Sequence, residues 1–134
     1  MPAGVIVCVG SSVWIALLRG QDTPEVARLR AIEPPDEVVL GDLILLEVLQ
    51  GARDEAHAAR IEGNLRAFPV EPVLTEARAI RAATHYRRLR ARGITIRRTI
   101  DLAIGTFCLD RGYALLHADR DFVPVAAHLG LTTA

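Results

Sequence analysis

Short apolar runs rich in β-branched residues, each followed directly by helical periodicity, constrain the fold of this chain most strongly. Three such runs stand at 5–9, 38–40 and 113–117. Strands that alternate with helices are typical of a parallel sheet, because a parallel neighbour is reached only through a long crossover. Two weaker runs, at 70–73 and 131–133, are candidate edge strands. We therefore predict an α/β fold, a three-layer α/β/α sandwich with a parallel sheet of four or five strands.

Seven helices are predicted between and after these strands. They are expected at 12–19, 23–32, 43–52, 55–67, 75–92, 99–111 and 122–129. Thr23 and Thr75 are typical N-cap residues. Four glycines mark helix ends: Gly51, Gly93, Gly112 and Gly130. With 134 residues and no linker-like segment, the chain is expected to form one domain over 1–134.

Composition limits the class of protein. Hydrophobic residues make up 51% of the chain and charged residues 24%, a balance typical of globular proteins. Cys8 and Cys108 fall in a predicted strand and a predicted helix, and we expect buried thiols rather than a disulfide. No apolar run is long enough to span a membrane and no basic region precedes the first run. We expect a cytoplasmic protein without membrane contact.

The formal net charge of zero argues against a strong overall attraction to nucleic acid. The distribution of charge is more informative than its sum. All sixteen basic residues are arginine, and half of them lie between Arg78 and Arg98. This cluster is either an ordinary solvated helix face or a surface that binds phosphates.

Acidic residues follow the predicted strands, at the edge of an open α/β sheet where ligands usually bind. Glu47 is the lone charge in an apolar helix, and Asp101 opens another apolar helix. Asp119 and Asp121 come after the strand at 113–117, and Asp121 is expected to cap the next helix. Structural alternatives are a buried arginine pair for Glu47 and a helix-cap or helix-dipole role for Asp101. We expect Glu47, Asp101 and Asp119 to converge in one electronegative pocket.

Three carboxylates without a cysteine favour a hard cation, Mg²⁺ or Mn²⁺, which usually acts on phosphate substrates. A site that includes His117 is an open alternative. The sequence contains neither of the common glycine-rich phosphate-binding motifs. The remaining chemistry is phosphodiester hydrolysis.

The order and spacing of these pieces resemble a PIN domain, and more narrowly a VapC-type toxin of a VapBC toxin–antitoxin system. The resemblance rests on "GSSVWIALLRG", "LLEVLQGAR" and "IRRTIDLAIGTFCLDRGYALLHADRDF". It implies a metal-dependent endoribonuclease that acts on RNA, with tRNA or rRNA as candidate substrates. It also implies a homodimer that is silenced by a cognate VapB-type antitoxin.

Gly10 departs from the family pattern. The first strand of the family normally ends in aspartate, so "GSS" stands where "DSS" is expected, and the resemblance makes Gly10 the position of a missing metal ligand. Metal affinity should fall, because one carboxylate ligand is lost. Three explanations are open: the gene was disarmed, deliberately or by selection, because an active toxin poisons its host; the protein is a naturally inactive relative; or Asp121 takes over as ligand.

The resemblance also assigns roles to individual residues. Asp101, together with the missing acid, would hold Mg²⁺, while Glu47 and Asp119 would bind a second ion or orient the attacking water. Ser12 and Thr99 would contact the acids or the metal-bound waters, unless they only cap their helices. The arginines expected to contact the RNA backbone are Arg87, Arg88, Arg97 and Arg98.

A second hypothesis keeps the fold and drops the catalysis. In this alternative the chain is a PIN-like binding module whose acidic cleft receives a basic partner segment, or RNA, without cleavage. Restoring the acid at Gly10 separates the two hypotheses, because only the first predicts a gain of nuclease activity.

Overall fold

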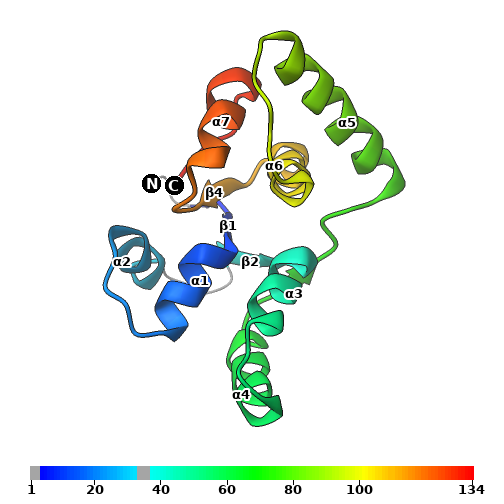
Figure 1. The fold of residues 1–134 in the computed structure, drawn as a ribbon. Helices are drawn as coiled ribbons and strands as arrows, with labels where there is room; N and C mark the ends of the chain where they lie inside the picture. The colour runs from blue at the N-terminus through cyan, green and yellow to red at the C-terminus, as the bar shows by residue number, and fades with distance from the viewer. Residues whose placement is uncertain (1–3, 33–36) are drawn as a thin grey trace.

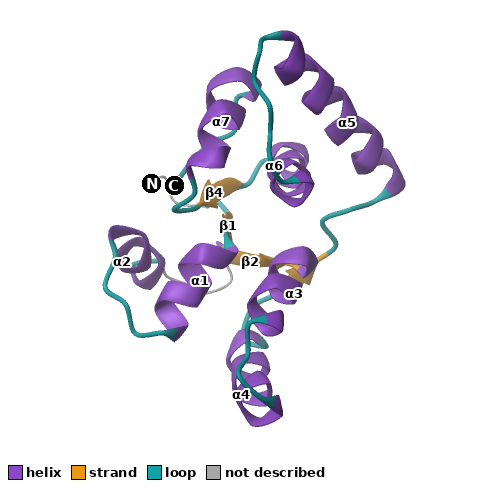
Figure 2. Cartoon of the chain, in the orientation of Figure 1, coloured by secondary structure: helices purple, strands orange, loops and turns teal. Residues whose placement is uncertain are grey.

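A computed structural model describes residues 4–32 and 37–134. Its strands form one four-stranded sheet in the order β3-β2-β1-β4, and all neighbouring strands are parallel. The strands, orange in Figure 2, are β1 (Val7–Val9), β2 (Val38–Gly41), β3 (Val70–Glu71) and β4 (Ala114–Leu116). The predicted parallel sheet is confirmed with four strands. The segment 131–133 adds only an isolated parallel bridge between Thr133 and Leu115.

Seven α-helices lie in the described ranges, close to their predicted positions. They are α1 (Ser11–Leu18), α2 (Pro24–Arg30), α3 (Asp42–Gln50), α4 (Glu55–Leu65), α5 (Glu76–Ala91), α6 (Thr99–Arg111) and α7 (Val123–Leu129), the last preceded by a 3₁₀ turn, η2 (Arg120–Phe122). Figure 1 shows α1 to α4 on one side of the sheet and α5 to α7 on the other. The predicted three-layer arrangement is therefore confirmed. Within 4–32 and 37–134, none of the helices has the length and apolarity needed to cross a membrane.

The helix boundaries follow from local chemistry. Thr23 Oγ1 accepts a hydrogen bond of 3.1 Å from Val26 N, and Thr75 caps α5 in the same way. At the other ends, Gly112 and Gly130 adopt φ of +70° and +79°, a conformation that favours glycine. These caps were readable from the sequence and confirm the predicted ends.

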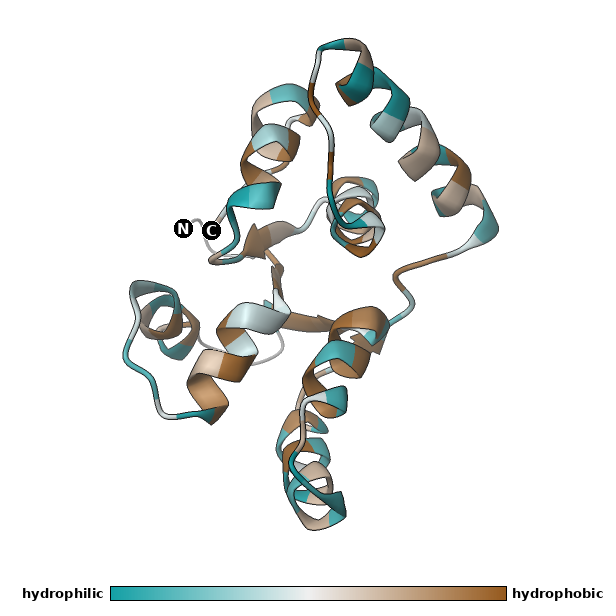
Figure 3. Ribbon diagram, viewed as in Figure 1, coloured by the Kyte–Doolittle hydropathy of each residue, from teal (hydrophilic) through white to brown (hydrophobic). Residues whose placement is uncertain are grey.

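The core lies on both faces of the sheet. The three residues of β1 are completely buried, as are the large side chains of Trp14 and Phe107, which pack on opposite sides. Figure 3 shows β1, β2 and β4 as mainly hydrophobic, as expected for strands covered on both faces, whereas the edge strand β3 contains the half-buried Glu71. Cys8 and Cys108 are buried free thiols, as predicted, and the pKa of Cys108 is raised well above its usual value by its hydrogen bond to Cys8 and by burial.

The sheet and its helices meet closely at one edge. α1 begins two residues after β1, and α3 begins directly after β2, so both helix N-termini lie at the carboxyl ends of the central strands. The loop after β4 begins at the same edge, because Gly10 N donates a hydrogen bond of 2.8 Å to the oxygen of Leu116, the last residue of β4. Side chains from these three segments are thereby brought to one place.

Candidate metal centre

A pocket of about 260 Å³ lies at the carboxyl edge of the sheet. Its walls come from α1, α3, the start of α6 and the loop after β4. Its acidic lining residues are Glu47, Asp101 and Asp119, and Gly10 lies in the same wall. The structure thus brings together the three acids that were expected to converge. Their roles in catalysis stay predictions.

Asp101, in the first turn of α6, is the most buried of these acids, with 4% of its surface exposed. Within 4–32 and 37–134, its Oδ2 atom has no hydrogen-bond partner. Burial raises the pKa of Asp101 to about 6, because removal from water disfavours the charged carboxylate. The nearby Arg98 cation acts in the opposite direction, and the negative charges of Asp119 and Glu47 add to the increase.

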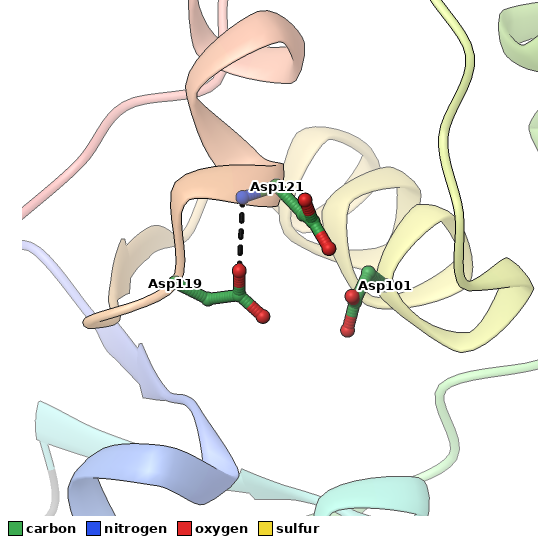
Figure 4. A group of neighbouring side chains, drawn as sticks. All are labelled: Asp101, Asp119 and Asp121. Carbon is green, nitrogen blue, oxygen red and sulfur yellow. Dashed lines mark hydrogen bonds between the residues drawn. The ribbon is translucent and has the colours of Figure 1, made fainter.

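Asp119 and Asp121 approach Asp101 from the segment after β4 (Figure 4). Carboxylate oxygens of the three aspartates, one from each, lie within 4.8 Å of one another. Asp119 Oδ1 also accepts a hydrogen bond of 2.9 Å from Asp121 N and so caps η2. The prediction that Asp121 caps the following helix is wrong: α7 has Phe122 at its N-cap and no side-chain cap. Because the Asp121 carboxylate does not cap α7, it is available to the cluster with Asp101 and Asp119.

The three aspartates fit a hard divalent cation. Each offers a carboxylate oxygen, the ligand that Mg²⁺ and Mn²⁺ prefer. The unpartnered Oδ2 of Asp101 gives this fit physical support, because a buried carboxylate oxygen is costly unless something binds it. His117 is outside this cluster. Its Nδ1 accepts a hydrogen bond of 3.2 Å from Asp119 N, and burial lowers the pKa of His117.

Glu47 is held by an arginine rather than by the aspartates. The side chain of Glu47 is 11% exposed and its Oε2 accepts a hydrogen bond from Arg98 Nη2. Arg98 Nη1 also lies 3.8 Å from Asp101 Oδ1. An arginine partner for Glu47, left open as an alternative, is therefore present, but the pair is not buried, because the Arg98 side chain is 49% exposed. The sequence carried a signal only for the approach of Arg98 to Asp101, because these two residues are three positions apart, about one helical turn.

The two hydroxyl residues predicted to support the acids, Ser12 and Thr99, lie in different pockets. Ser12 lines the acidic pocket, whereas Thr99 lines a different, apolar pocket between α5 and α6. Helix capping explains neither of them, because Gly10 and Arg98 occupy the N-caps of α1 and α6 and neither helix has a side-chain cap. Only Ser12 therefore remains placed to contact the acids.

Gly10 is buried but its backbone is ordinary. Its φ of −70° and ψ of 158° are open to any residue, so the conformation does not require glycine. A Cβ atom built on Gly10 would lie 3.4 Å from Leu116 O, a normal van der Waals contact. The position can therefore accept a Cβ atom, and Gly10 itself lines the pocket together with Glu47, Asp101 and Asp119.

The arginine cluster divides into structural and exposed members. Arg78 is buried, and its Nε donates a hydrogen bond of 3.0 Å to Asp110 Oδ2, so it belongs to the packing of α5 on α6. Arg87, Arg88 and Arg97 are exposed. Across the part of the chain that the structure describes, none of these three has an acidic side chain within 4.0 Å.

A family model described as "PIN domain" matches residues 7–127. The chain belongs to the PIN domain family. Among curated proteins it is similar to ribonuclease VapC11 of Mycobacterium tuberculosis, at 24% identity over 131 residues, which covers 96% of this chain and 98% of the relative. Its acidic cluster lies within the matched region.

Solved structures share the fold of this PIN domain. VapBC2 of Rickettsia felis, bound to a DNA fragment from its promoter, has a TM-score of 0.76 at 14% identity and covers 97% of this chain and 98% of that one. VapC20 of Mycobacterium tuberculosis, described as a sarcin-ricin loop cleaving toxin, has a TM-score of 0.68 at 22% identity and covers 91% and 95%. At these identities the likeness establishes the fold.

Proposed function

We propose that this chain is the toxin component of a type II toxin–antitoxin system, a VapC-type Mg²⁺-dependent endoribonuclease built as one PIN domain over 1–134. The observation that carries the proposal is the unpartnered Oδ2 of buried Asp101, within a cluster of carboxylates at the carboxyl edge of the sheet. Family membership and the similarity to VapC ribonucleases support the reaction class.

The residues that would hold Mg²⁺, or Mn²⁺ in its place, are Asp101, Asp119 and Asp121. When bound, the ion supplies Lewis acidity: it lowers the pKa of a coordinated water and neutralises charge on the phosphate. Asp119 is kept in place by its hydrogen bond from Asp121 N, and Asp101 by burial. Glu47, which lines the same pocket, would be the acceptor that orients the attacking water.

Gly10 reduces this activity in the proposed account. The family pattern expects an acidic ligand at this position, and the main chain of Gly10 lies in the wall of the pocket. With glycine there, one negative charge and one oxygen ligand are absent, so the affinity for the ion falls. We infer a weak or inactive nuclease whose fold is intact.

RNA would be bound mainly through its phosphates. Arg87, Arg88 and Arg97 are exposed and supply positive charge without acidic partners nearby. The chain has only six aromatic residues, which makes extensive base stacking a minor part of binding. Structured regions of tRNA or rRNA are the candidate substrates.

The proposed partners are a VapB-type antitoxin and a second copy of this chain. The neighbouring solved structures include VapBC complexes, which supports the antitoxin. An apolar groove of about 610 Å³ between α3, α5 and α6 supports the homodimer, since apolar grooves of this size are usually covered. Its lining includes Leu43, Ala83, Tyr86, Ile100 and Ala103.

A non-cleaving binding module is the second candidate. The contact between Arg98 and Glu47 favours it, because it shows that the acidic pocket accepts a guanidinium group. In that case the pocket binds a basic partner segment, or RNA alone, and the fold serves as a recognition domain.

The deciding experiment restores the acid. Gly10→Asp should give Mg²⁺-dependent cleavage of a panel of tRNAs and ribosomal stem-loops, and growth arrest on induction. Gly10→Asn, which adds nearly the same volume without charge, is the matched control and should stay inactive. If Gly10→Asp folds, binds Mn²⁺ and cleaves nothing in the panel, the enzymatic proposal is wrong and the binding module is favoured.

A further inference from the structure

The guanidinium group of Arg98 occupies one wall of the acidic pocket. Arg98 is the residue directly before α6, so its side chain leaves the backbone one turn before Asp101. It donates to Glu47 Oε2, and its Nη1 lies 3.8 Å from Asp101 Oδ1. One arginine therefore neutralises acids from two different helices, α3 and α6.

The surrounding carboxylates hold this cation strongly. Its Nη2 is hydrogen-bonded to Glu47, and its Nη1 forms a longer ion pair with Asp101. Asp101 also belongs to the carboxylate cluster that fits a divalent ion. Arg98 and the ion therefore share the negative charge of Asp101.

We propose that Arg98 is a built-in counter-ion that competes with the divalent cation for this pocket and so sets the metal affinity of the protein. The proposal rests on the proposed metal site at Asp101, Asp119 and Asp121. Arg98 holds the carboxylates together in the metal-free protein, and binding of the ion weakens the hold of Arg98 on Asp101.

Two features make this exchange physically reasonable. The Arg98 side chain is 49% exposed, so its guanidinium can turn into water at little cost in solvation. Its partners are not equally exposed: Glu47 and Asp101 have side-chain exposures of 11% and 5%. The arginine is therefore the mobile member of the group, while the carboxylates stay in the pocket.

Removal of the guanidinium should strengthen metal binding. A cation a few ångströms from a divalent ion repels it, and at the dielectric of a partly buried site this corresponds to about a ten- to hundredfold change in affinity. The same removal leaves the carboxylates uncompensated when no metal is bound. The metal-free protein should therefore lose thermal stability, and added metal should restore it.

The test is a titration of Mn²⁺ into the full chain, followed by the electron paramagnetic resonance signal of free Mn²⁺. The proteins compared are the unchanged chain, Arg98→Ala, Arg98→Gln and the matched control Arg97→Ala, which removes the same charge from the neighbouring exposed position. We expect Arg98→Ala and Arg98→Gln to bind Mn²⁺ about ten- to hundredfold more tightly. Arg97→Ala should change the affinity by less than about threefold, because exposed charges are screened by salt.

A second readout separates counter-ion exchange from a purely structural role. Melting temperatures are measured in EDTA and in saturating Mg²⁺. Arg98→Ala should melt lower than the unchanged chain in EDTA and show a larger increase on addition of Mg²⁺. Arg98→Gln keeps a hydrogen-bond donor, so it should lose less stability in EDTA while keeping the tighter Mn²⁺ binding.

The outcomes distinguish this inference from the proposed function. Equal or weaker Mn²⁺ binding by both folded Arg98 variants, with clear binding by the unchanged chain, overturns the counter-ion proposal and leaves the metal site standing. Absence of Mn²⁺ binding in every protein overturns both.

Discussion

The main-chain N–H of Gly10 donates a 2.8 Å hydrogen bond to the carbonyl oxygen of Leu116, which holds the end of β1 against the end of β4. A side chain does not break this bond, because φ at Gly10 is −70° and a Cβ would lie 3.4 Å from the same oxygen. We predict that Gly10→Asp folds like the unchanged chain and binds Mn²⁺ about tenfold or more tightly, since it adds a carboxylate. Calorimetric titration measures the two affinities, and equal values would contradict the proposal that Gly10 marks a missing metal ligand.

Gly41, unlike Gly10, has no room for a side chain. It ends β2, and a Cβ there would lie 2.6 Å from Val73 Cγ2. Gly41→Ala should therefore lower the free energy of unfolding by about 1–3 kcal/mol through overpacking, measured by urea denaturation. The control is Gly63→Ala on α4, where a Cβ meets nothing within 4 Å. That change should raise the free energy of unfolding by about 0.5–1 kcal/mol, and a loss as large as at Gly41 would contradict the packing argument.

Asp110 joins α6 to α5 through Arg78 and Arg81. Hydrogen bonds and charge from the two arginines hold the pKa of Asp110 below its ordinary value of 3.8. A lowered pKa stabilises the folded state above the unfolded pKa, and this contribution is lost as the pH falls through the folded pKa. Asp110→Asn should thus lower the free energy of unfolding by about 1–2 kcal/mol at pH 7, reduced by solvent screening.

The difference between Asp110→Asn and the unchanged chain should shrink once the pH falls below 3.8. Denaturant titrations across the acid range measure it. Asp22→Asn is the control, because the Asp22 side chain is 93% exposed and contacts Arg30 only at 3.5 Å. A difference for Asp110→Asn that does not change with pH would rule out the ion pairs as its source.

The apolar groove between α3, α5 and α6 gives a prediction about assembly. Ala83 is exposed and lines this groove, so Ala83→Glu places a charge in the proposed dimer interface. Light scattering should show a dimer for the unchanged chain and a monomer for Ala83→Glu. Ala59→Glu, the same change on the exposed surface of α4, should leave the dimer intact. A chain that is monomeric without any substitution would contradict the homodimer.

Much of the fold was predictable from local signals. The β-branched runs, the threonine caps and the glycines at helix ends are each decided within a few residues, so strands and helices fell close to their predicted positions. The parallel order of the strands followed from the helices between them. The segment 131–133 was less predictable, because pairing at a sheet edge depends on a partner far along the chain.

The candidate site was predictable in its composition and less so in its contacts. The three acids could be placed at the carboxyl edge from topology alone. The exchange of roles between Asp119 and Asp121 could not, because it depends on the backbone turn that presents Asp121 N to Asp119. Neither could the pairing of Arg98 with Glu47, since these two residues are 51 positions apart in the sequence.

A calorimetric titration of Mn²⁺ determines whether Asp101, Asp119 and Asp121 form a divalent cation site. We expect one saturable site in the unchanged chain and its loss in folded Asp119→Asn, whereas the exposed-surface control Asp22→Asn binds like the unchanged chain. Failure of the unchanged chain to bind Mn²⁺, or identical binding by Asp119→Asn, would contradict the proposed cation site.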